Sequence, residues 1–351
     1  MKNLIACSLL AVVPGGVALS TQYEADHSLR IEIESSVTLE TTTMEIEVDG
    51  ERQEPRGGSM ASESTKREVH VDHVVEVKDG KPAKVRRQFE ELAGKITFSG
   101  GENTNELELE APLGGTTIEI TRDGDGPADA TAVEGGKPDD KLLEGHVPDL
   151  FLDGLLPDGA VEVGATWELD SDTIRKALRL DVADALFPRQ QPESSGEEGG
   201  RRRGSMRRMM GDSGLMQRAE WKGKAKLAAT DEEVDGVACA VIELVLTASG
   251  DIPEPEMGGR RERGQVFGVD AIGRSAAGLA VTKSTFEVDL TGKLAFATKE
   301  KRPVSLDLEG SAKTEVESES TRSERTFKMH MIREGSVTFQ ATVTPEAAKS
   351  K

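Results

Sequence analysis

The chain holds five histidines, and only two of them stand close together in the sequence. His70 and His73 belong to the run His70-Val71-Asp72-His73, inside a segment that alternates apolar and polar residues like a β-strand. Side chains three positions apart on a strand point to opposite faces of the sheet, so this pair cannot easily bind one metal ion. We therefore interpret the run as a packing feature.

The motif Asp123-Gly124-Asp125-Gly126 begins like a calcium-binding loop. Its next ligand position is Pro127, however, and no glutamate stands where such a loop would close. Aspartate and glycine are also the ordinary residues of a turn, which is the interpretation we favour. The sequence therefore predicts no metal site.

Catalytic motifs are missing from the sequence, which has no G-x-S-x-G, no P-loop and no H-E-x-x-H. The many glutamates make some close pair of carboxylates inevitable, but acid–base catalysis also needs a cleft and a perturbed pKa. Cys239 lies in an apolar run that is typical of a small buried residue rather than of a nucleophile. We predict no catalytic residue, no cofactor and a protein that is not an enzyme.

Composition narrows the range of partners. A net charge of −20 argues against nucleic acid, because phosphate binding needs a basic face, and against a stable contact with anionic lipid. Only 3% of the residues are aromatic. Carbohydrate and single-strand binders usually need aromatic platforms for stacking, so both of these ligand classes are disfavoured.

The first twenty residues have the pattern of a secretory signal peptide. Lys2 gives a positive start, an apolar run covers residues 4–13, and Ala18 and Ser20 provide small residues near a cleavage point. We expect cleavage after Ser20 and export to the periplasm or the outside of the cell. The apolar run is too short for a stable membrane-spanning helix, so no transmembrane span is expected in the mature chain. A lesser alternative is lipid attachment to Cys7.

Most of the remaining chain alternates in the manner of β-strands, for example at Leu29, Ile31 and Ile33. At Met44 the apolar positions change parity, which predicts a bulge or turn near residues 41–43. Residues 171–187 carry an apolar stripe at helical spacing, with Asp170 or Ser171 as the cap and Pro188 as the end.

These patterns predict a mainly β protein of antiparallel curved sheets, as a half-barrel or as two related β-halves, with one clear helix packed on the sheet. The predicted organisation is a signal peptide (1–20), an N-terminal β-half (21–147), a connecting strand and helix (148–187), a disordered Arg/Gly-rich loop (188–214), a C-terminal β-half (215–345) and a tail (346–351). The similar runs 89–98 and 286–296 suggest an internal duplication, or else two ordinary hairpins with Gly-Lys turns.

The connecting segment contains Leu156-Pro157 followed by Gly164 and Trp167, within an LLPxxxVxxGxxW signature. With its strand-rich flanks, this signature resembles a family of exported, β-rich bacterial proteins, and the resemblance implies no established activity. The layout is also loosely similar to periplasmic lipid-carrier (LolA-like) folds, in which a curved sheet encloses an apolar ligand. Gly164 and Trp167 also have a structural interpretation, a tight turn and a core anchor, which we favour over ligand contact.

The leading functional hypothesis is an exported, non-enzymatic binding or carrier module, whose ligand is an apolar small molecule or a lipid. It calls for a continuous apolar pocket of roughly 300 Å³ or more. The alternative is a structural or interaction protein of the cell envelope, which calls for an exposed apolar patch or an unpaired edge strand. A hydrolase is a third hypothesis and would need a buried carboxylate pair or a Ser–His contact in a cleft.

Overall fold

A computed structural model describes most of the chain. The described residues are 16–54, 60–101, 103–124, 126–188, 216–217, 219–251, 280–322 and 325–346. The predicted disordered loop falls outside them apart from Pro188, as do residues 1–15 of the predicted signal peptide and all of the predicted tail except Glu346.

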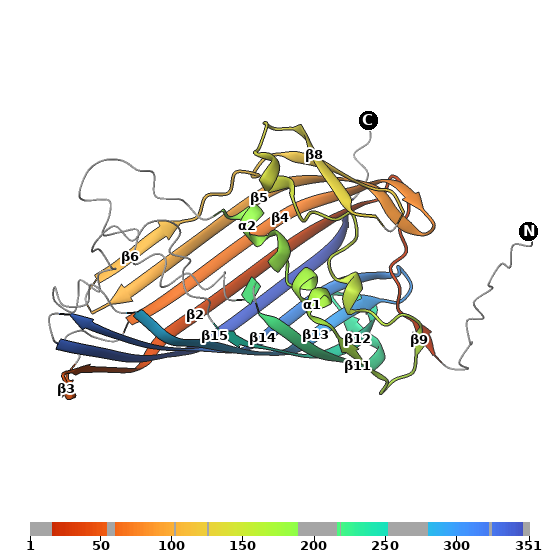
Figure 1. Ribbon diagram of the computed structural model, residues 1–351. Coiled ribbons are helices and arrows are strands. Elements are labelled where there is room, and N and C mark those ends of the chain that lie inside the picture. Colours follow the sequence, from red (N-terminus) through yellow and green to blue (C-terminus); the bar gives the residue numbers. More distant parts are fainter. Residues whose placement is uncertain are drawn as a thin grey trace, which may run out of the picture.

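A 13-stranded antiparallel sheet dominates the fold, and it stays open rather than closing on itself (Figure 1). Along its main path lie β10 (Thr166–Leu169), β11 (Glu220–Val234), β12 (Val237–Asp251), β13 (Ala280–Ala297), β14 (Arg302–Arg322), β15 (Arg325–Glu346), β2 (Ser28–Val48), β4 (Met60–Lys78), β5 (Lys81–Gly100), β7 (Thr117–Arg122) and β8 (Ala128–Glu134). Two short strands extend it, β3 (Glu51–Gln53) beside β2 and β6 (Asn103–Glu108) beside β5.

The two ends of the sequence meet in the middle of this sheet. β15 pairs with β2 from Phe327–Val48 to Glu346–Ser28, so the N-terminal and C-terminal strands form one continuous surface. The predicted mainly β, antiparallel and curved fold is confirmed. The runs 89–98 and 286–296 lie inside β5 and β13, so neither Gly-Lys pair forms a hairpin turn.

Burial follows the predicted alternation along the strands. In β15, Val337, Phe339, Ala341 and Val343 are buried, and the residues between them are exposed. The predicted bulge is also present, because Ile332 pairs with Thr43 and Arg333 with Thr41, which leaves Thr42 as an extra residue. The bulge lets the apolar side chains of β2 stay on the concave face while their sequence parity changes.

Glycines at neighbouring positions allow the sheet to curve. Gly292, Gly310 and Gly335 lie in β13, β14 and β15. A Cβ atom at each position would lie 1.7–1.8 Å from a carbonyl oxygen of the adjacent strand. Only a residue without a side chain fits here, which is how curved sheets commonly place their bends.

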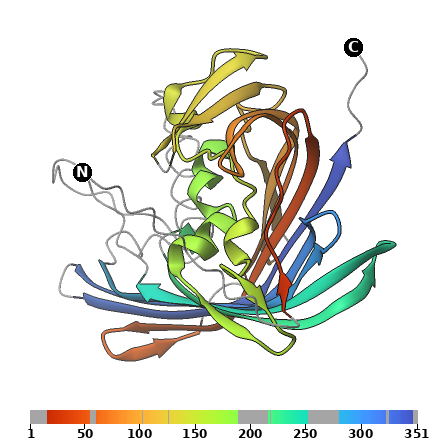
Figure 2. The same cartoon turned by 90° about the vertical axis from the view of Figure 1, so that its right-hand side faces the viewer.

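Part of the concave face is covered by a segment that we call the plug, residues 146–156 and 170–187 (Figure 2). It contains η2 (Asp153–Leu155), α1 (Ser171–Ala177), η3 (Leu180–Val182) and α2 (Ala183–Leu186). Asp170, one of the two caps that the sequence predicts, caps α1 by accepting a hydrogen bond from the Thr173 backbone N–H at 2.7 Å. The predicted 171–187 helix is broken at Arg179, whose φ of 59° is left-handed.

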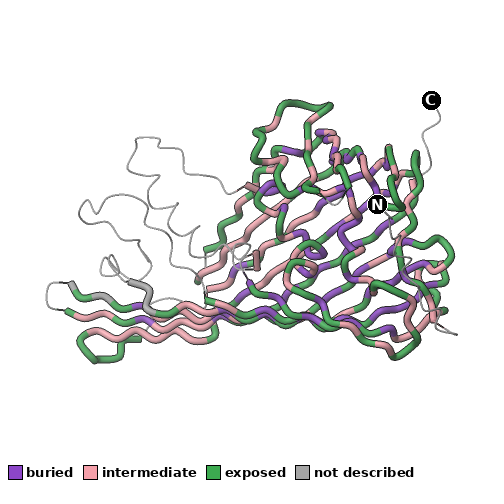
Figure 3. The backbone as a smooth tube through the Cα atoms, turned by 45° about the vertical axis from the view of Figure 1, so that its right-hand side comes forward, coloured by how far each residue is buried: buried purple, intermediate pink, exposed green. Residues whose placement is uncertain are grey.

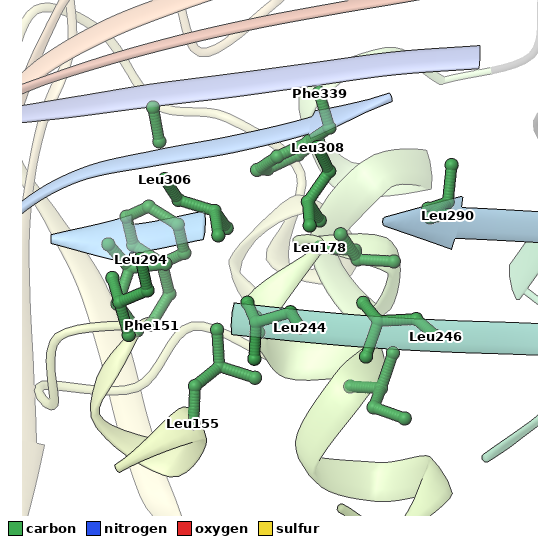
Figure 4. Close-up of a cluster of buried hydrophobic side chains, with 14 of the residues drawn as sticks. Phe151, Leu155, Leu178, Leu244, Leu246, Leu290, Leu294, Leu306, Leu308 and Phe339 are labelled. Atoms are coloured by element: carbon green, nitrogen blue, oxygen red, sulfur yellow. The ribbon is translucent and has the colours of Figure 1, made fainter. Parts of the chain in front are cut away.

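Plug and sheet share the main hydrophobic core (Figure 4). Phe151, Leu155 and Leu178 of the plug face leucines from β12, β13 and β14. A smaller cluster joins Leu186 and Phe187 to Ile118 and Ile120 of β7, near η1 (Asp140–Leu143). The helical segment therefore packs on the sheet through its apolar face, as expected for an amphipathic element.

Residues 17–19, which fall inside the predicted signal peptide, also belong to the fold. β1 (Val17–Ala18) pairs with β9 (Ala160–Val161). Leu19 is only 1% exposed and lies in the main core. Next to it, Asp153 of the plug accepts hydrogen bonds from the hydroxyls of Thr21, at 2.5 Å, and Tyr23. The start of the described chain thus holds the plug from the side.

Candidate functional site

The signature residues lie where the chain leaves the plug and enters the sheet. Trp167 in β10 donates a hydrogen bond from Nε1 to the carbonyl of Leu155 at 3.1 Å. Gly164 has a φ of 92°, and its N–H donates to Leu227 at 2.7 Å. Leu156 and Pro157 are half-buried, and Leu156 packs against the main core. These contacts are those of a turn and an anchor between plug and sheet.

Beneath the plug lies a group of buried polar side chains that we call the polar cluster. It consists of Glu68, His70 and Asp72 from β4, Arg87 from β5, and His146 and Arg179 from the plug, and all six are buried. The three β4 residues occupy alternate positions and therefore share one face of the strand. Burial of this many ionisable groups requires compensating partners.

Two ion pairs provide most of that compensation. Arg87 donates to both carboxylate oxygens of Asp72, from Nε and Nη2, each at 2.7 Å. Arg179 donates from Nη2 to Oε1 of Glu68, also at 2.7 Å. The left-handed backbone at Arg179 turns the chain between α1 and η3 at the residue whose guanidinium reaches Glu68. This pair therefore ties the plug to the floor of the sheet.

The pairs set the charge states of the cluster. Burial alone would raise the pKa of Glu68, but Arg179 and His70 outweigh it and hold that pKa well below the ordinary value. Arg87 and His70 likewise lower the pKa of Asp72 against the effect of burial. Burial lowers the pKa of His146 to about 3, with Arg87 and Arg179 adding to the effect. At neutral pH the carboxylates are ionised and His146 is neutral.

Several polar atoms of the cluster have no hydrogen-bond partner among the described residues. They are both ring nitrogens of His146, Nη1 of Arg87 and Nε of Arg179. Nδ1 of His70 lies 3.0 Å from Oε1 of Glu68, the same oxygen that accepts a hydrogen bond from Arg179. The Phe89 ring lies 5.9 Å from the ring of His70 and 5.8 Å from that of His146.

An apolar pocket adjoins the polar cluster. It lies between the plug and the strands, has a volume of about 100 Å³, and is lined by Ile33, Val37, Leu178, Phe187 and Phe339 together with Glu68 and Arg179 of the cluster. The last two residues therefore belong to both regions. This volume is smaller than the roughly 300 Å³ expected for a small-molecule site.

Beyond the plug, the concave face continues as a second apolar surface, which we call the distal strip. It consists of Met44 and Ile46 of β2, Val316 of β14, and Phe327 and Met331 of β15. Register places Met331 beside both Met44 and Val316. All five are half-buried, and Figure 3 shows the change from buried strand segments near the plug to intermediate ones beyond it. Among the described residues, none of these five side chains belongs to the hydrophobic clusters that the plug forms with the sheet, whereas Met329 between them is buried.

The geometry that a hydrolase would need is present only in part. Glu68 and Asp72 are both buried, but each is ion-paired with an arginine and has a lowered pKa, which suits neither proton donation nor proton uptake near pH 7. A Ser–His contact also exists, with Oγ of Ser28 3.0 Å from Nδ1 of His73. The His73 side chain is 39% exposed, and this half-buried cross-strand pair lies outside the pocket.

Among the described residues, one group on the outer face of the sheet has metal-ligand chemistry. Glu315, Glu317 and His330 have ligand atoms within 4.8 Å of one another, and all three are half-buried. Lys283 already lies 3.5 Å from Glu315 and 3.6 Å from Glu317, and Nε2 of His330 lies 3.0 Å from Glu315. Lysine and histidine thus compensate these carboxylates.

The predicted turn at Asp123 and Gly124 is present, with Gly124 at a φ of 59°, while Asp125 falls outside the described residues.

Sequence reasoning separated His70 from His73 correctly but missed the polar cluster. Val69 and Val71 mark this strand in the sequence, and they pair with Glu32 and Arg30 on the outer face. The signal that could have identified the cluster is the alternation Glu68, His70, Asp72 itself. Three ionisable residues on one face of a strand indicate a buried polar site once it is known that Arg87 lies opposite Asp72.

No helix in the described part of the chain is both long and apolar enough to cross a membrane. Comparison with known proteins adds no function, because no family model matches the chain and no curated protein matches it significantly.

Proposed function

We propose that the protein is an exported, non-enzymatic binding or carrier module whose ligand is an apolar small molecule or a lipid. The observation that carries the proposal is the distal strip, where the inward-facing pattern of the sheet continues beyond the plug. Apolar residues on a concave face that the described part of the chain only half covers are typical of binding surfaces. Support for export comes from the signal-peptide pattern and from the resemblance to periplasmic lipid-carrier layouts.

The arrangement suits a long, flexible ligand better than a compact one. The pocket beside the plug holds about 100 Å³, which is enough only for part of a ligand, while the strip extends the apolar surface along the strands. Each buried methylene contributes about 0.8 kcal/mol, so ten of them would gain roughly 8 kcal/mol before the costs of association. Two methionines in the strip add side chains that adapt to an irregular partner.

The first test is mass spectrometry of organic extracts from protein purified from its native compartment. A stoichiometric lipid or other apolar molecule supports the proposal. The second test is titration with the fluorescent apolar probe N-phenyl-1-naphthylamine, which becomes bright when it is bound in an apolar site.

One pair of variants makes the titration specific. Met331→Asp places a charge in the strip, and we expect about tenfold weaker probe binding, which corresponds to about 1.4 kcal/mol. Ile332→Asp is the matched control, because the adjacent residue of the same strand is also half-buried but faces the other side. Equal effects of the two changes would contradict the proposal. A co-purifying protein in place of a small molecule would favour the envelope-interaction alternative, for which the same strip would be the contact surface.

A further inference from the structure

The unpartnered atoms of the polar cluster are concentrated around His146. This residue is 2% exposed, and neither of its ring nitrogens has a hydrogen-bond partner among the described residues. Arg87 Nη1 and Arg179 Nε share this condition, although both guanidiniums use other nitrogens in ion pairs. Buried polar atoms normally have partners, so this group of exceptions marks a place where a polar ligand would find hydrogen-bond partners.

The chemistry of the orphaned atoms restricts that molecule. The two arginine nitrogens can only donate, and a neutral imidazole donates from one nitrogen and accepts at the other. The missing partner must therefore offer acceptor oxygens. A carboxylate or a similar oxygen-rich acid would form charge-assisted hydrogen bonds with the arginines, which are stronger than those of a neutral hydroxyl.

The charges of the cluster allow such a partner if a proton comes with it. Glu68 and Asp72 balance Arg87 and Arg179, so the cluster is neutral while His70 and His146 are neutral. A bound carboxylate would add one negative charge. The groups facing His146 are Arg87 and Phe89 from β5, Glu68 and His70 from β4, and Arg179 from the plug. Of the two neutral histidines, His70 already lies beside Glu68 and Asp72, whereas no ion pair is found for His146 among the described residues. A bound carboxylate would be the counter-ion of a protonated His146, which can therefore take up the balancing proton.

The polar cluster and the apolar pocket share Glu68 and Arg179 as wall residues. A molecule whose head contacts Arg179 of the cluster can therefore place its tail directly in the pocket. We propose that the polar cluster is a head-group site and that the ligand is a single aliphatic chain ending in an acid, with long-chain carboxylates as the simplest case. This inference rests on the proposed function and adds the chemical class of the ligand.

Isothermal titration calorimetry with three probes tests the inference. Dodecanoate carries both head and tail, dodecanol carries the tail with a neutral head, and acetate carries the acid alone. We expect dodecanoate to bind about 10- to 100-fold more tightly than dodecanol, the range expected from hydrogen bonds to a charged group. Acetate should show no measurable heat at millimolar concentration, because it lacks the tail.

His146→Phe keeps a flat ring beside Phe89 but removes both nitrogens. We expect this variant to bind dodecanol like the unmodified protein and to lose most of the preference for dodecanoate. His73→Phe is the matched control on the outer side of the same region, and it should keep the preference. An unchanged preference in His146→Phe would overturn the inference.

A measurement on the unmodified chain keeps the test valid even if the variant folds poorly. Repeating the dodecanoate titration in buffers with different ionisation enthalpies reports the protons taken up on binding. We expect about one proton per ligand at pH 7 for dodecanoate and none for dodecanol. Equal affinities for dodecanoate and dodecanol, with no proton uptake, would overturn the head-group site but leave the proposed function standing. Failure of both dodecanoate and dodecanol to bind would instead overturn the proposed function.

Discussion

The ion pair between Arg179 and Glu68 makes a strong prediction about stability. The two side chains are 8% and 4% exposed, and their charged atoms are 2.7 Å apart. Replacing Arg179 by Met keeps a long side chain but leaves Glu68 buried without its cation. Removing one partner of a buried pair typically costs about 3–5 kcal/mol, while an exposed pair contributes about 0–1 kcal/mol.

The expected loss lies near the lower end of that range, at about 3 kcal/mol, because His70 can take up a proton beside Glu68 and offset part of the cost. Urea denaturation followed by far-UV circular dichroism at pH 7 measures it. The double variant Glu68→Leu/Arg179→Met removes both charges and should be more stable than Arg179→Met alone. A loss below about 1 kcal/mol for Arg179→Met would show that the pair behaves like a surface contact and would refute the reasoning.

The pH dependence of the stability of Arg179→Met tests the same ion pair in a second way. In the unmodified protein Arg179 holds the pKa of Glu68 below its unfolded value of 4.5, so this contribution to stability is present above pH 4.5 and is lost as the pH falls further. In Arg179→Met the buried carboxyl has a raised pKa, and its penalty disappears once it is protonated. The difference between the two proteins should therefore shrink between pH 7 and pH 4. A constant difference would contradict the assignment of the effect to Glu68.

Three further predictions concern other parts of the fold. The folded-state pKa of His146 is about 3, against an ordinary value of 6.5, so the unfolded chain binds the proton first and stability should fall as the pH drops from 6.5 toward 3. His146→Leu should flatten this decline relative to the unmodified chain in parallel urea titrations, and an identical pH profile would count against a buried neutral imidazole. Gly335→Ala should destabilise by more than about 3 kcal/mol or prevent folding, because its Cβ would lie 1.7 Å from the Thr38 carbonyl oxygen. Gly100→Ala, with its nearest atom at 3.7 Å, should change the thermal midpoint little, and similar midpoints for the two variants would disprove the close approach. In the chain that keeps residues 1–20, Leu19→Ala should cost about 2–5 kcal/mol, whereas Val245→Ala at a 52% exposed site should stay within about 0.5 kcal/mol in the same urea assay, and an equally small cost for Leu19→Ala would place residue 19 outside the core.

Local patterns were sufficient to predict the class of fold and some of its details. Alternation identified the strands, the change of parity at Met44 located the bulge at Thr42, and Asp170 marked the start of α1. Each of these signals lies within a few residues of the feature that it predicts. The break at Arg179 was not predicted, because the apolar stripe continues through it and the reason for the turn, Glu68, lies 111 residues away in the sequence.

The alternation of Glu68, His70 and Asp72 is a local signal for the polar cluster, but its meaning depends on partners that are distant in the sequence. Its members come from two strands and two parts of the plug, and pairing Arg87 with Asp72 requires the register of β4 and β5. The apolar residues of β4 do not mark the face that meets the plug, because Val69 and Val71 are buried although they face away from it. Alternation identifies a strand reliably, but it does not say which face meets the core when both faces are covered.

The burial of Leu19 changes what trimming of the amino terminus would do. Cutting the chain after Ser20 would remove a core leucine together with β1, and it would create a new positive amino group at Thr21, the residue whose hydroxyl already contacts Asp153. Burial raises the pKa of Asp153 to about 6, so the new cation would favour its ionised form. The trimmed chain would thus lose the hydrophobic packing of Leu19 and gain attraction between its amino group and Asp153. Because salt screens this attraction, the amino terminus would hold the plug less firmly as the salt concentration rises.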